Sequence, residues 1–288
     1  TDTICSDATL NHNLSDDVNL VGTSFSWSAT NNPNVTGETT TTSTATNVAD
    51  TLTNISTIAQ TVIYTITPTS IDGCIGNSYT YTVIVNPEPI LVTSPSVAIC
   101  SDATLNHNLN DDINIAGVSF SWSATENPNV TGETTTNSTA TSITDTLINI
   151  SGTVQTVTYT ITTTSTNGCQ GDTYTYVVTI NPKPVVITPP TDTICSDITL
   201  NHNLNDDINL AGVTFSWSAA DNPNVTGETT TTSTDTSITD TLTNTSGTVQ
   251  TITYIITPTS NGCEGDSYTY VVTIKPEPLV VMPPTDTI

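Results

Sequence analysis

The sequence predicts an all-β protein built from three tandem β-sandwich domains arranged as an extended rod. Thr makes up about a quarter of the 288 residues, and Val, Ile and Tyr accompany it, which is the composition of β-sheets. One long pattern occurs three times at regular spacing, the signature of a repeat protein. Within each copy, apolar and polar residues alternate with a period of two, as in strands with one buried face.

The repeat is clearest from its cysteines. The string CSDATLNHNL begins at Cys5 and recurs at Cys100, and CSDITLNHNL begins at Cys195. FSWSA, NPNVTGETTT and a Pro-x-Pro triplet follow in the same order in each copy. A unit of about 95 residues is large enough for its own core, so we expect three domains. Their expected bounds are 1–87, in which the lead-in strand is incomplete, then 88–182 and 183–277, with 278–288 as the lead-in strand of a following repeat.

The middle copy shows the expected strands. Val118, Phe120 and Trp122 share one face, and the segments 156–162 and 174–180 alternate in the same way. Weaker strand patterns cover 90–92, 104–109, 130–134 and 143–148. A tight turn is expected at 167–168, with counterparts at 72–73 and 261–262. About seven short strands with one inward Trp are typical of an immunoglobulin-like sandwich.

Charge and hydropathy exclude several classes of partner. The chain has 27 acidic residues against 2 Lys and no Arg, a net charge of −25. Nucleic-acid binding and attraction to anionic membranes both depend on basic side chains, so neither is expected. No apolar run approaches the roughly 18 residues that a membrane-spanning helix needs, so we expect no membrane insertion.

The six cysteines fall two to a repeat, at Cys5 and Cys74, Cys100 and Cys169, and Cys195 and Cys263. Even counts at repeated spacing predict disulfides and an oxidising compartment. We expect each bond to join the two cysteines of one repeat, which would stabilise that domain by roughly 4 kcal/mol on the chain-entropy model. Zinc needs four ligands close together, so no transition metal is expected.

These motifs together resemble a known family. The frame of ICSD, FSW, NVTG, DTLxN, a YTIT-like strand, GCxG, YTY and Pro-x-Pro is similar to the PKD-like, immunoglobulin-fold repeats of large secreted surface proteins of Bacteroidetes, including adhesins and gliding-motility-associated proteins. The resemblance covers the whole chain three times, and the NHNLNDDIN stretch departs from it. It implies an extracellular, cell-surface β-sandwich spacer without catalytic residues.

The histidines His12, His107 and His202 occur once per repeat in the same NHN context. A general base needs partners within hydrogen-bond reach, but every candidate set recurs three times. Three identical active sites in tandem would be unusual, so we expect structural or surface histidines and no enzyme.

Paired acidic residues suggest a possible cation site. Hard cations bind carboxylate, amide and carbonyl oxygens, and calcium would offset the self-repulsion of an acidic chain. No EF-hand-like pattern is present, and the alternative is a solvated acidic loop. No cofactor is expected other than this possible calcium, at Asp16, Asp17, Asp111, Asp112, Asp206 and Asp207.

Asp-Thr-Ile or Asp-Thr-Leu recurs at fixed places in the repeats and looks like the Asp-Ser/Thr-aliphatic O-glycosylation signal of Bacteroidetes. The resemblance implies possible covalent glycans at Thr3, Thr51, Thr146, Thr193, Thr241 and Thr287. The alternative is that threonines on the solvent-exposed face of the sheet form pairs with threonines on the neighbouring strand.

The repeats favour a structural role: a stiff, disulfide-stabilised segment of an extracellular stalk or filament. The expected partners are neighbouring repeats of the same chain or copies of itself. One alternative is an adhesin whose repeats bind a glycan or another cell-surface ligand. A second is a filament subunit whose C-terminal strand, within 280–288, completes the first domain of the next subunit.

Overall fold

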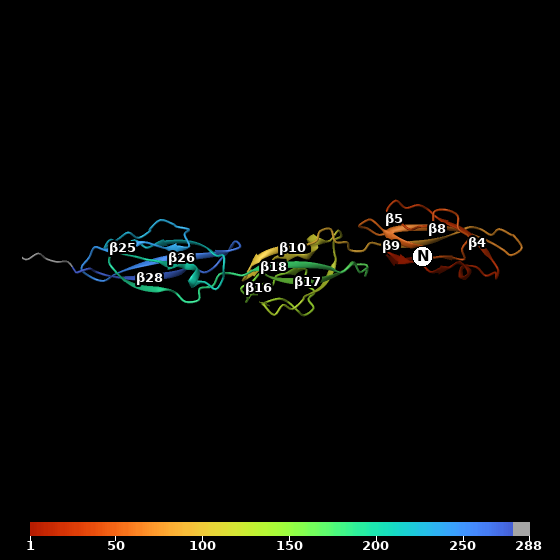
Figure 1. Cartoon of the computed structure of the whole chain (residues 1–288). Coiled ribbons are helices and arrows are strands. Elements are labelled where there is room, and N and C mark those ends of the chain that lie inside the picture. The colour runs from red at the N-terminus through yellow and green to blue at the C-terminus, as the bar shows by residue number, and fades with distance from the viewer. Residues whose placement is uncertain (279–288) are drawn as a thin grey trace, which may run out of the picture.

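The computed structural model describes residues 1–278 and shows three sandwiches placed end to end as a rod (Figure 1). The predicted all-β fold with three tandem domains is confirmed. The lead-in strand expected at 278–288 lies outside the described residues except for Pro278. Among the described residues, no helix has the length and apolarity to cross a membrane.

The first domain contains nine strands and a short 3-10 helix. They are β1 (Asp2–Cys5), β2 (Ala8–Thr9), β3 (His12–Asn13), η1 (Leu14–Asp17), β4 (Ser24–Ala29), β5 (Val35–Thr36), β6 (Asn47–Val48), β7 (Thr51–Asn54), β8 (Gln60–Thr69) and β9 (Tyr79–Asn86).

The other two domains repeat this order. The second consists of β10 (Ser96–Cys100), β11 (Ala103–Thr104), β12 (His107–Asn108), η2 (Leu109–Asp112), β13 (Ser119–Ala124), β14 (Val130–Thr131), β15 (Ser142–Ile143), β16 (Thr146–Asn149), β17 (Gln155–Thr164) and β18 (Tyr174–Asn181). The third consists of β19 (Thr191–Cys195), β20 (Ile198–Thr199), β21 (His202–Asn203), η3 (Leu204–Asp207), β22 (Thr214–Ala219), β23 (Val225–Thr226), β24 (Ser237–Ile238), β25 (Thr241–Asn244), β26 (Gln250–Ser260), β27 (Cys263–Glu264) and β28 (Tyr268–Lys275).

Two sheets face each other in every domain. In the first, the larger sheet has the order β1-β9-β8-β4 and the smaller one the order β2-β7-β5, with β3 and β6 paired beside it. The first strand runs parallel to the last, so that Cys5 lies opposite Asn86. Both strands therefore point toward the next domain, one continuing into the linker and the other ending at a cysteine.

Each domain has its own core between these sheets. The three tryptophans are buried, as their alternation predicts, and the indole N–H of Trp27 donates to the Ala45 carbonyl at 2.9 Å. Tyr64 is fully buried, and its hydroxyl donates to Asp50 at 2.8 Å. This hydrogen bond supplies the partner that a buried phenol requires, and Tyr159 and Tyr254 repeat it.

The linkers belong to the domain that follows them. The predicted strand at 90–92 is reduced to a single bridge between Leu91 and Ile113, repeated by Val186 and Ile208. Leu91 packs against the core of the second domain, and Val186 packs against that of the third. Prolines flank the segment on both sides, at Pro89 and Pro95 in the first linker, and neither has the N–H that would extend the pairing into a longer ladder.

The expected tight turns are present in all three domains. Asn261 and Gly262 both have positive φ, at 48° and 78°, and they join β26 to β27 through paired Ser260 and Cys263. This is the backbone geometry of a two-residue hairpin turn. The first two domains carry one more residue here, with Gly73 and Gly168 at φ of 82°.

Candidate functional site: the bridged domain junctions

Two disulfides cross the boundaries between domains. Cys5 of the first domain is bonded to Cys169 of the second, and Cys100 of the second is bonded to Cys263 of the third. In both pairs the Cα atoms are 5.5 Å apart although more than 160 residues separate them in sequence. The first cysteine of each repeat thus bonds the second cysteine of the next repeat.

The prediction of a disulfide within each repeat is wrong. Cys5 is the last residue of β1 and lies at the end of the first domain that faces the second. Cys74 precedes β9 and lies at the opposite end of the first domain. The eight residues of β9 separate these two ends by roughly 25 Å at about 3.3 Å per residue. A disulfide needs Cα atoms within about 7 Å, so the two cysteines of one repeat cannot pair. Cys74 and Cys195 are free and exposed.

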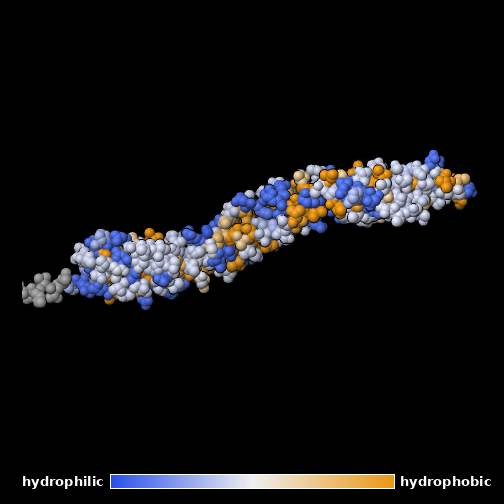
Figure 2. Space-filling model, turned by 90° about the horizontal axis from the view of Figure 1, so that it is seen from above, coloured by the Kyte–Doolittle hydropathy of each residue, from blue (hydrophilic) through white to orange (hydrophobic). Residues whose placement is uncertain are grey.

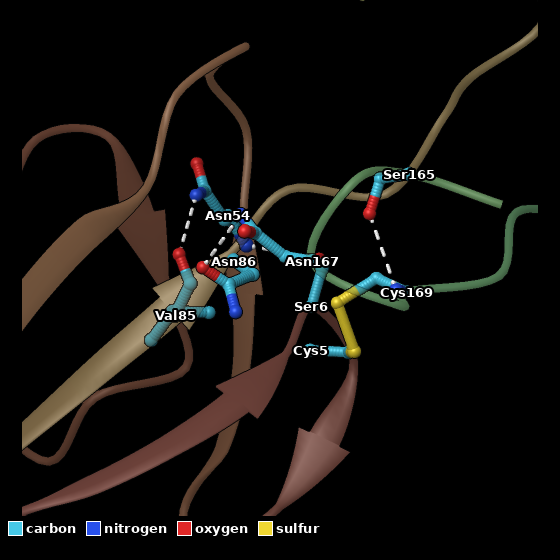
Figure 3. Close-up of a disulfide and its surroundings, with 8 residues drawn as sticks. All are labelled: Cys5, Ser6, Asn54, Val85, Asn86, Ser165, Asn167 and Cys169. Carbon is cyan, nitrogen blue, oxygen red and sulfur yellow. Dashed lines mark hydrogen bonds between the residues drawn. A yellow bond between two sulfur atoms is a disulfide. The ribbon is translucent and has the colours of Figure 1, made fainter. Parts of the chain in front are cut away.

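The first junction also has direct polar contacts, which Figure 3 shows around the sulfur bridge. The Asn167 side chain of the second domain donates to the Asn86 side chain of the first at 3.1 Å. The Cys169 amide donates to Ser165 Oγ at 3.2 Å, which holds the turn that carries the cysteine. Cys169 is fully buried, so the disulfide lies inside the interface.

Backbone hydrogen bonds hold the linker against the following domain. The Val92 amide donates to the Asp112 carbonyl at 2.8 Å, and the Asn114 amide donates to the Ile90 carbonyl at 3.1 Å. The Asn114 side chain accepts from the Ile90 amide at 2.8 Å. The same three bonds recur at the second junction between 185–187 and 207–209. Both prolines of the Pro-x-Pro triplet are buried at each junction.

A glycine is required where the linker passes the second cysteine. A Cβ at Gly171 would overlap the Pro89 carbonyl, and one at Gly265 would overlap the Pro184 carbonyl. Neither glycine has a positive φ, so the requirement is space and not backbone conformation. This explains the GCxG motif, which sequence reasoning identified without a role.

The two junctions differ in charge. Glu88 in the first linker lies near Asp7 and Asp172, and burial followed by these two negative charges raises the pKa of Glu88. Lys183 takes the place of Glu88 in the second linker, and its Nζ lies 3.7 Å from Asp102 Oδ2. The first junction therefore brings three acidic side chains together, whereas Lys183 offsets part of the negative charge at the second junction.

The predicted structural histidines form one side of a polar cluster. His107 Nε2 lies 2.9 Å from Asp112 Oδ2, and its ring stacks on Tyr176 with centroids 4.1 Å apart. Tyr174 donates to the same carboxylate at 3.1 Å. Burial, then the charge and hydrogen bond of Asp112, raise the pKa of Tyr174. The cluster ties η2 to β18, and His12 and His202 make the equivalent contact.

The acidic pairs proposed for calcium divide into two roles. The second residue of each pair, Asp17, Asp112 or Asp207, accepts from His and Tyr. The first residue, Asp16, Asp111 or Asp206, accepts from the Asn that caps the 3-10 helix. Within residues 1–278 no group of three or more His, Cys, Asp or Glu side chains is arranged to hold a metal ion. Calcium binding stays an untested prediction.

Five of the six candidate glycosylation threonines fall in the described residues, and all five are exposed. Thr51, Thr146 and Thr241 each share a hydrogen bond of 2.6–2.7 Å with the threonine opposite, as cross-strand pairing predicts. Thr3 and Thr193 lie on the first strands β1 and β19. Thr287 lies outside the described residues, and glycosylation itself stays a prediction.

Comparison with known proteins agrees with this architecture. A model of the PKD-like domain family matches residues 2–89, 97–184 and 192–278. No curated protein sequence matches the chain.

Among solved structures, the I67-I69 fragment of the titin I-band is 12% identical, covers 96% of this chain and 95% of its own, and has a TM-score of 0.42. Drosophila OTK extracellular domains 3-5 are 12% identical, with coverages of 96% and 94% and a TM-score of 0.30. Mouse cadherin-23 EC22-24 is 10% identical, with coverages of 96% and 95% and a TM-score of 0.28. The three family matches cover most of the sequence, and the chain belongs to the PKD-like domain family, of which it carries three tandem copies.

Proposed function

We propose that the chain is a stiff, tension-bearing segment of an extracellular stalk or filament at a cell surface. The observation that carries this proposal is that two covalent connections cross each junction, a peptide linker and a disulfide. A junction with one flexible connection bends as a hinge, whereas two separated connections resist both bending and twisting. The disulfides favour an oxidising location outside the cell. The proposal assigns the chain no catalytic role.

The disulfides also shorten the covalent path along the rod. The segment from Cys169 to Cys195 contains only β18, the linker and β19, which is about 26 residues and spans roughly 90 Å when extended. The segment from Cys74 to Cys100 has the same make-up, with β9, a linker and β10. The Cys5–Cys169 disulfide joins the end of β1 to the start of the segment 169–195. The Cys100–Cys263 disulfide joins the end of the segment 74–100 to the third domain just before its last strand, β28.

The shortest covalent path between the two ends runs from β1 through the Cys5–Cys169 disulfide, back along the second domain to Cys100, and through the Cys100–Cys263 disulfide to β28. Residues 6–99 and 170–262 lie in loops outside this path. Under tension the disulfides therefore limit how far the first and third domains can extend. An array of domains with internal disulfides would instead have only a peptide linker at each junction.

The decisive experiment compares the bending of the two junctions in single particles by electron microscopy. The double variant C5S/C169S should widen the distribution of bend angles at the first junction and leave the second unchanged. The variant C100S/C263S is the matched control and should do the opposite. Equal distributions of bend angles in the wild type and in both variants would contradict a mechanical role of the disulfides.

A ligand-binding role for the repeats is a second candidate, favoured by a groove at equivalent positions in the first two domains. The groove of the first domain is about 580 Å³ and is lined by His12, Asp17 and Tyr81, among others. That of the second is about 530 Å³, and His107, Asp112 and Tyr176 line it. A glycan array would test this candidate. A hit that is weakened by Asp2→Lys, a change in the lining of the first groove, would support it, and an empty array would count against it.

Three further features belong to the proposal. Copies of the chain are expected to join as partners, calcium is expected to bind at the acidic pairs, and glycans are expected on the exposed Asp-Thr sites. The edge of β9 in the first domain is already occupied by β1, so a donor strand from another subunit would need a different edge. Calorimetric titration with calcium tests the calcium sites. Mass spectrometry of material from the native source tests the glycans.

A further inference from the structure

We propose that the second domain binds an extended peptide segment of another protein, one that has alternating apolar residues and basic flanks. The segment adds as a strand to the free edge of β10 and places an apolar side chain in the groove beside it. This site rests on the second candidate function and deepens it, because it gives the groove of the second domain a ligand class.

β10 is an edge strand with unused backbone hydrogen-bonding groups. In the sheet order β10-β18-β17-β13 it has a neighbouring strand on one side only within residues 1–278 (Figure 1). The Pro95 carbonyl accepts from the Val177 amide of β18 at 3.3 Å. Because the backbone groups of successive residues point to alternate sides of a strand, those of Ser96 and Ala98 point away from β18. Both residues are exposed, so their N–H and C=O groups are open to a further strand.

The corresponding edges of the first and third domains carry a carboxylate that β10 lacks. Asp2 on β1 and Asp192 on β19 accept from tyrosine hydroxyls of β9 and β28 at 2.6 and 3.4 Å. An inward-pointing charge on an edge strand is a common protection against the addition of another strand. Val97 occupies this position in β10 and is 36% exposed. The edge of the second domain therefore has no such protection.

The next position along the strand differs in the same sense. Thr3 of β1 and Thr193 of β19 are candidate glycosylation sites, whereas β10 has Ala98 there. Alanine has no hydroxyl that could carry a glycan. Neither a charge nor a covalent sugar at these two positions therefore shields the edge of β10.

Val97 also leaves a buried hydroxyl without a partner. Tyr176 is 3% exposed and lines the groove beside β10. Its hydroxyl makes no hydrogen bond within residues 1–278, whereas the equivalent Tyr81 and Tyr270 donate to Asp2 and Asp192. Every fully enclosed side-chain nitrogen or oxygen in these residues has a partner, so the Tyr176 hydroxyl opens into the groove. It is a donor for a carbonyl of the bound segment.

The groove itself suits an apolar side chain. It has a volume of about 530 Å³, and Val97 and Ile99 of β10 line it together with Leu105, which follows β11. Figure 2 shows more apolar surface over the middle of the rod than beside the grey trace. A strand that pairs with β10 directs every second side chain to the same face. Pockets for these alternate side chains are what make strand addition selective.

Charge favours a basic partner over a second copy of this chain. The chain has a net charge of −25, and neither Lys183 nor Lys275 lines the groove. The carboxylate that does line it, Asp112, already accepts from His107 and Tyr174. Lys or Arg flanks are attracted to the acidic rod, whereas two copies of the rod repel each other.

The test selects a display library of random peptides on the whole chain, with peptides of about ten residues, enough for one strand and its flanks. Enriched peptides should alternate apolar residues and carry Lys or Arg at their ends. Fluorescence anisotropy then measures the affinity of these peptides. Val97→Asp, which copies β1 and β19, should lower this affinity at least tenfold, because it places a charge in the contact. Thr160→Asp, at an exposed position of β17 in the same domain, is the matched control and should not lower it.

Two further measurements test the mode of binding. NMR hydrogen exchange should show slower exchange of the Ser96 and Ala98 amides in the complex, because the added strand accepts from the backbone at this edge. Tyr176→Phe should weaken binding about threefold to tenfold through the lost hydrogen bond. Asp192→Val, which gives the third domain the same kind of edge, should create a second peptide site on the chain.

The proposal is overturned if no peptide is enriched, if enriched peptides bind Val97→Asp as tightly as the wild type, or if Thr160→Asp weakens them equally. Bound peptides that leave the Ser96 and Ala98 amides unprotected would overturn strand addition. Pairing of two copies of the chain through β10 would overturn the choice of partner. A glycan that binds this groove while no peptide does would refute the peptide and leave the ligand-binding candidate standing. The stalk function is tested separately, by the bend angles at the junctions.

Discussion

Cys5 and Cys169 lie 164 residues apart in the sequence but form a disulfide across the boundary between the first two domains. Cys5 reaches that boundary because its strand runs parallel to β9, whose chain continues into the linker. Cys169 reaches it from the hairpin turn that faces the linker from the other side. The bond therefore acts on the relative position of two domains and not on the stability of one.

Stretching the chain from its ends should show this arrangement directly. In the oxidised protein, full extension should reach about a third of the length that the reduced protein reaches at about 3.5 Å per residue. The reason is that the two overlapping disulfide loops remove most of the chain from the path between the ends. Single-molecule force spectroscopy measures both lengths. Equal lengths before and after reduction would show that the bonds do not form in the protein.

Removing an inter-domain disulfide should leave the individual domains folded. The variant C5S/C169S should keep the protection of core amides in β8 and β17 within about 0.5 kcal/mol, the range of substitutions that do not disturb a core. Hydrogen exchange measured by mass spectrometry gives these values. A large loss of protection in the first domain alone would instead indicate that the bond supports the sandwich itself.

Glu88 should make the first junction weaker as pH rises. Its pKa is raised in the folded chain, so the folded form holds its proton more tightly and stability falls as pH increases from the ordinary Glu pKa through the raised one. Glu88→Lys, which copies the second junction, should strengthen the first junction at pH 7 and remove this fall. The protection of the Ile90 and Val92 amides reports on the junction. Glu277→Lys, at an exposed linker position, is the control and should leave it unchanged.

The buried carboxylate of Asp112 should contribute more to the stability of the second domain than the carboxylate of Asp111. Asp112 is 2% exposed and accepts from His107 and Tyr174. Asp112→Ala should destabilise the second domain by about 2–4 kcal/mol, because buried Tyr174 and half-buried His107 both lose their acceptor. Asp111→Ala, at the exposed residue beside it, should cost about 1 kcal/mol or less through the lost contact with the helix-capping Asn108. Denaturant titration, followed by hydrogen exchange of second-domain amides, gives the loss of stability in each variant. Similar losses in Asp112→Ala and Asp111→Ala would contradict the different roles assigned to the two residues.

The equivalent carboxylate of the first domain, Asp17, is more exposed than Asp112. It accepts from the same residue types, but its side chain is 26% exposed, compared with 3% for Asp112. We therefore expect Asp17→Ala to cost the first domain less than Asp112→Ala costs the second, since water can replace the lost acceptor. Parallel unfolding of the two variants checks the order.

The sequence by itself determined the domain number, the strand pattern and the core. Period-2 alternation around Trp122 and Tyr159 specifies which side chains are buried, because a strand has only two faces. Repetition of that pattern then specifies three copies of one fold. These features are local in the sequence and need no knowledge of how distant segments meet.

Only the tertiary structure decided which cysteines bond. Spacing showed that the cysteines occur in pairs, and the same spacing is compatible with bonds within or between repeats. The outcome depends on the parallel pairing of β1 with β9, which places Cys5 and Cys74 at opposite ends of the domain. The role of Gly171 was hidden for the same reason, since its neighbour is the Pro89 carbonyl of a linker far away in the sequence. Strand direction and domain stacking are long-range properties, and they set the chemistry at the junctions.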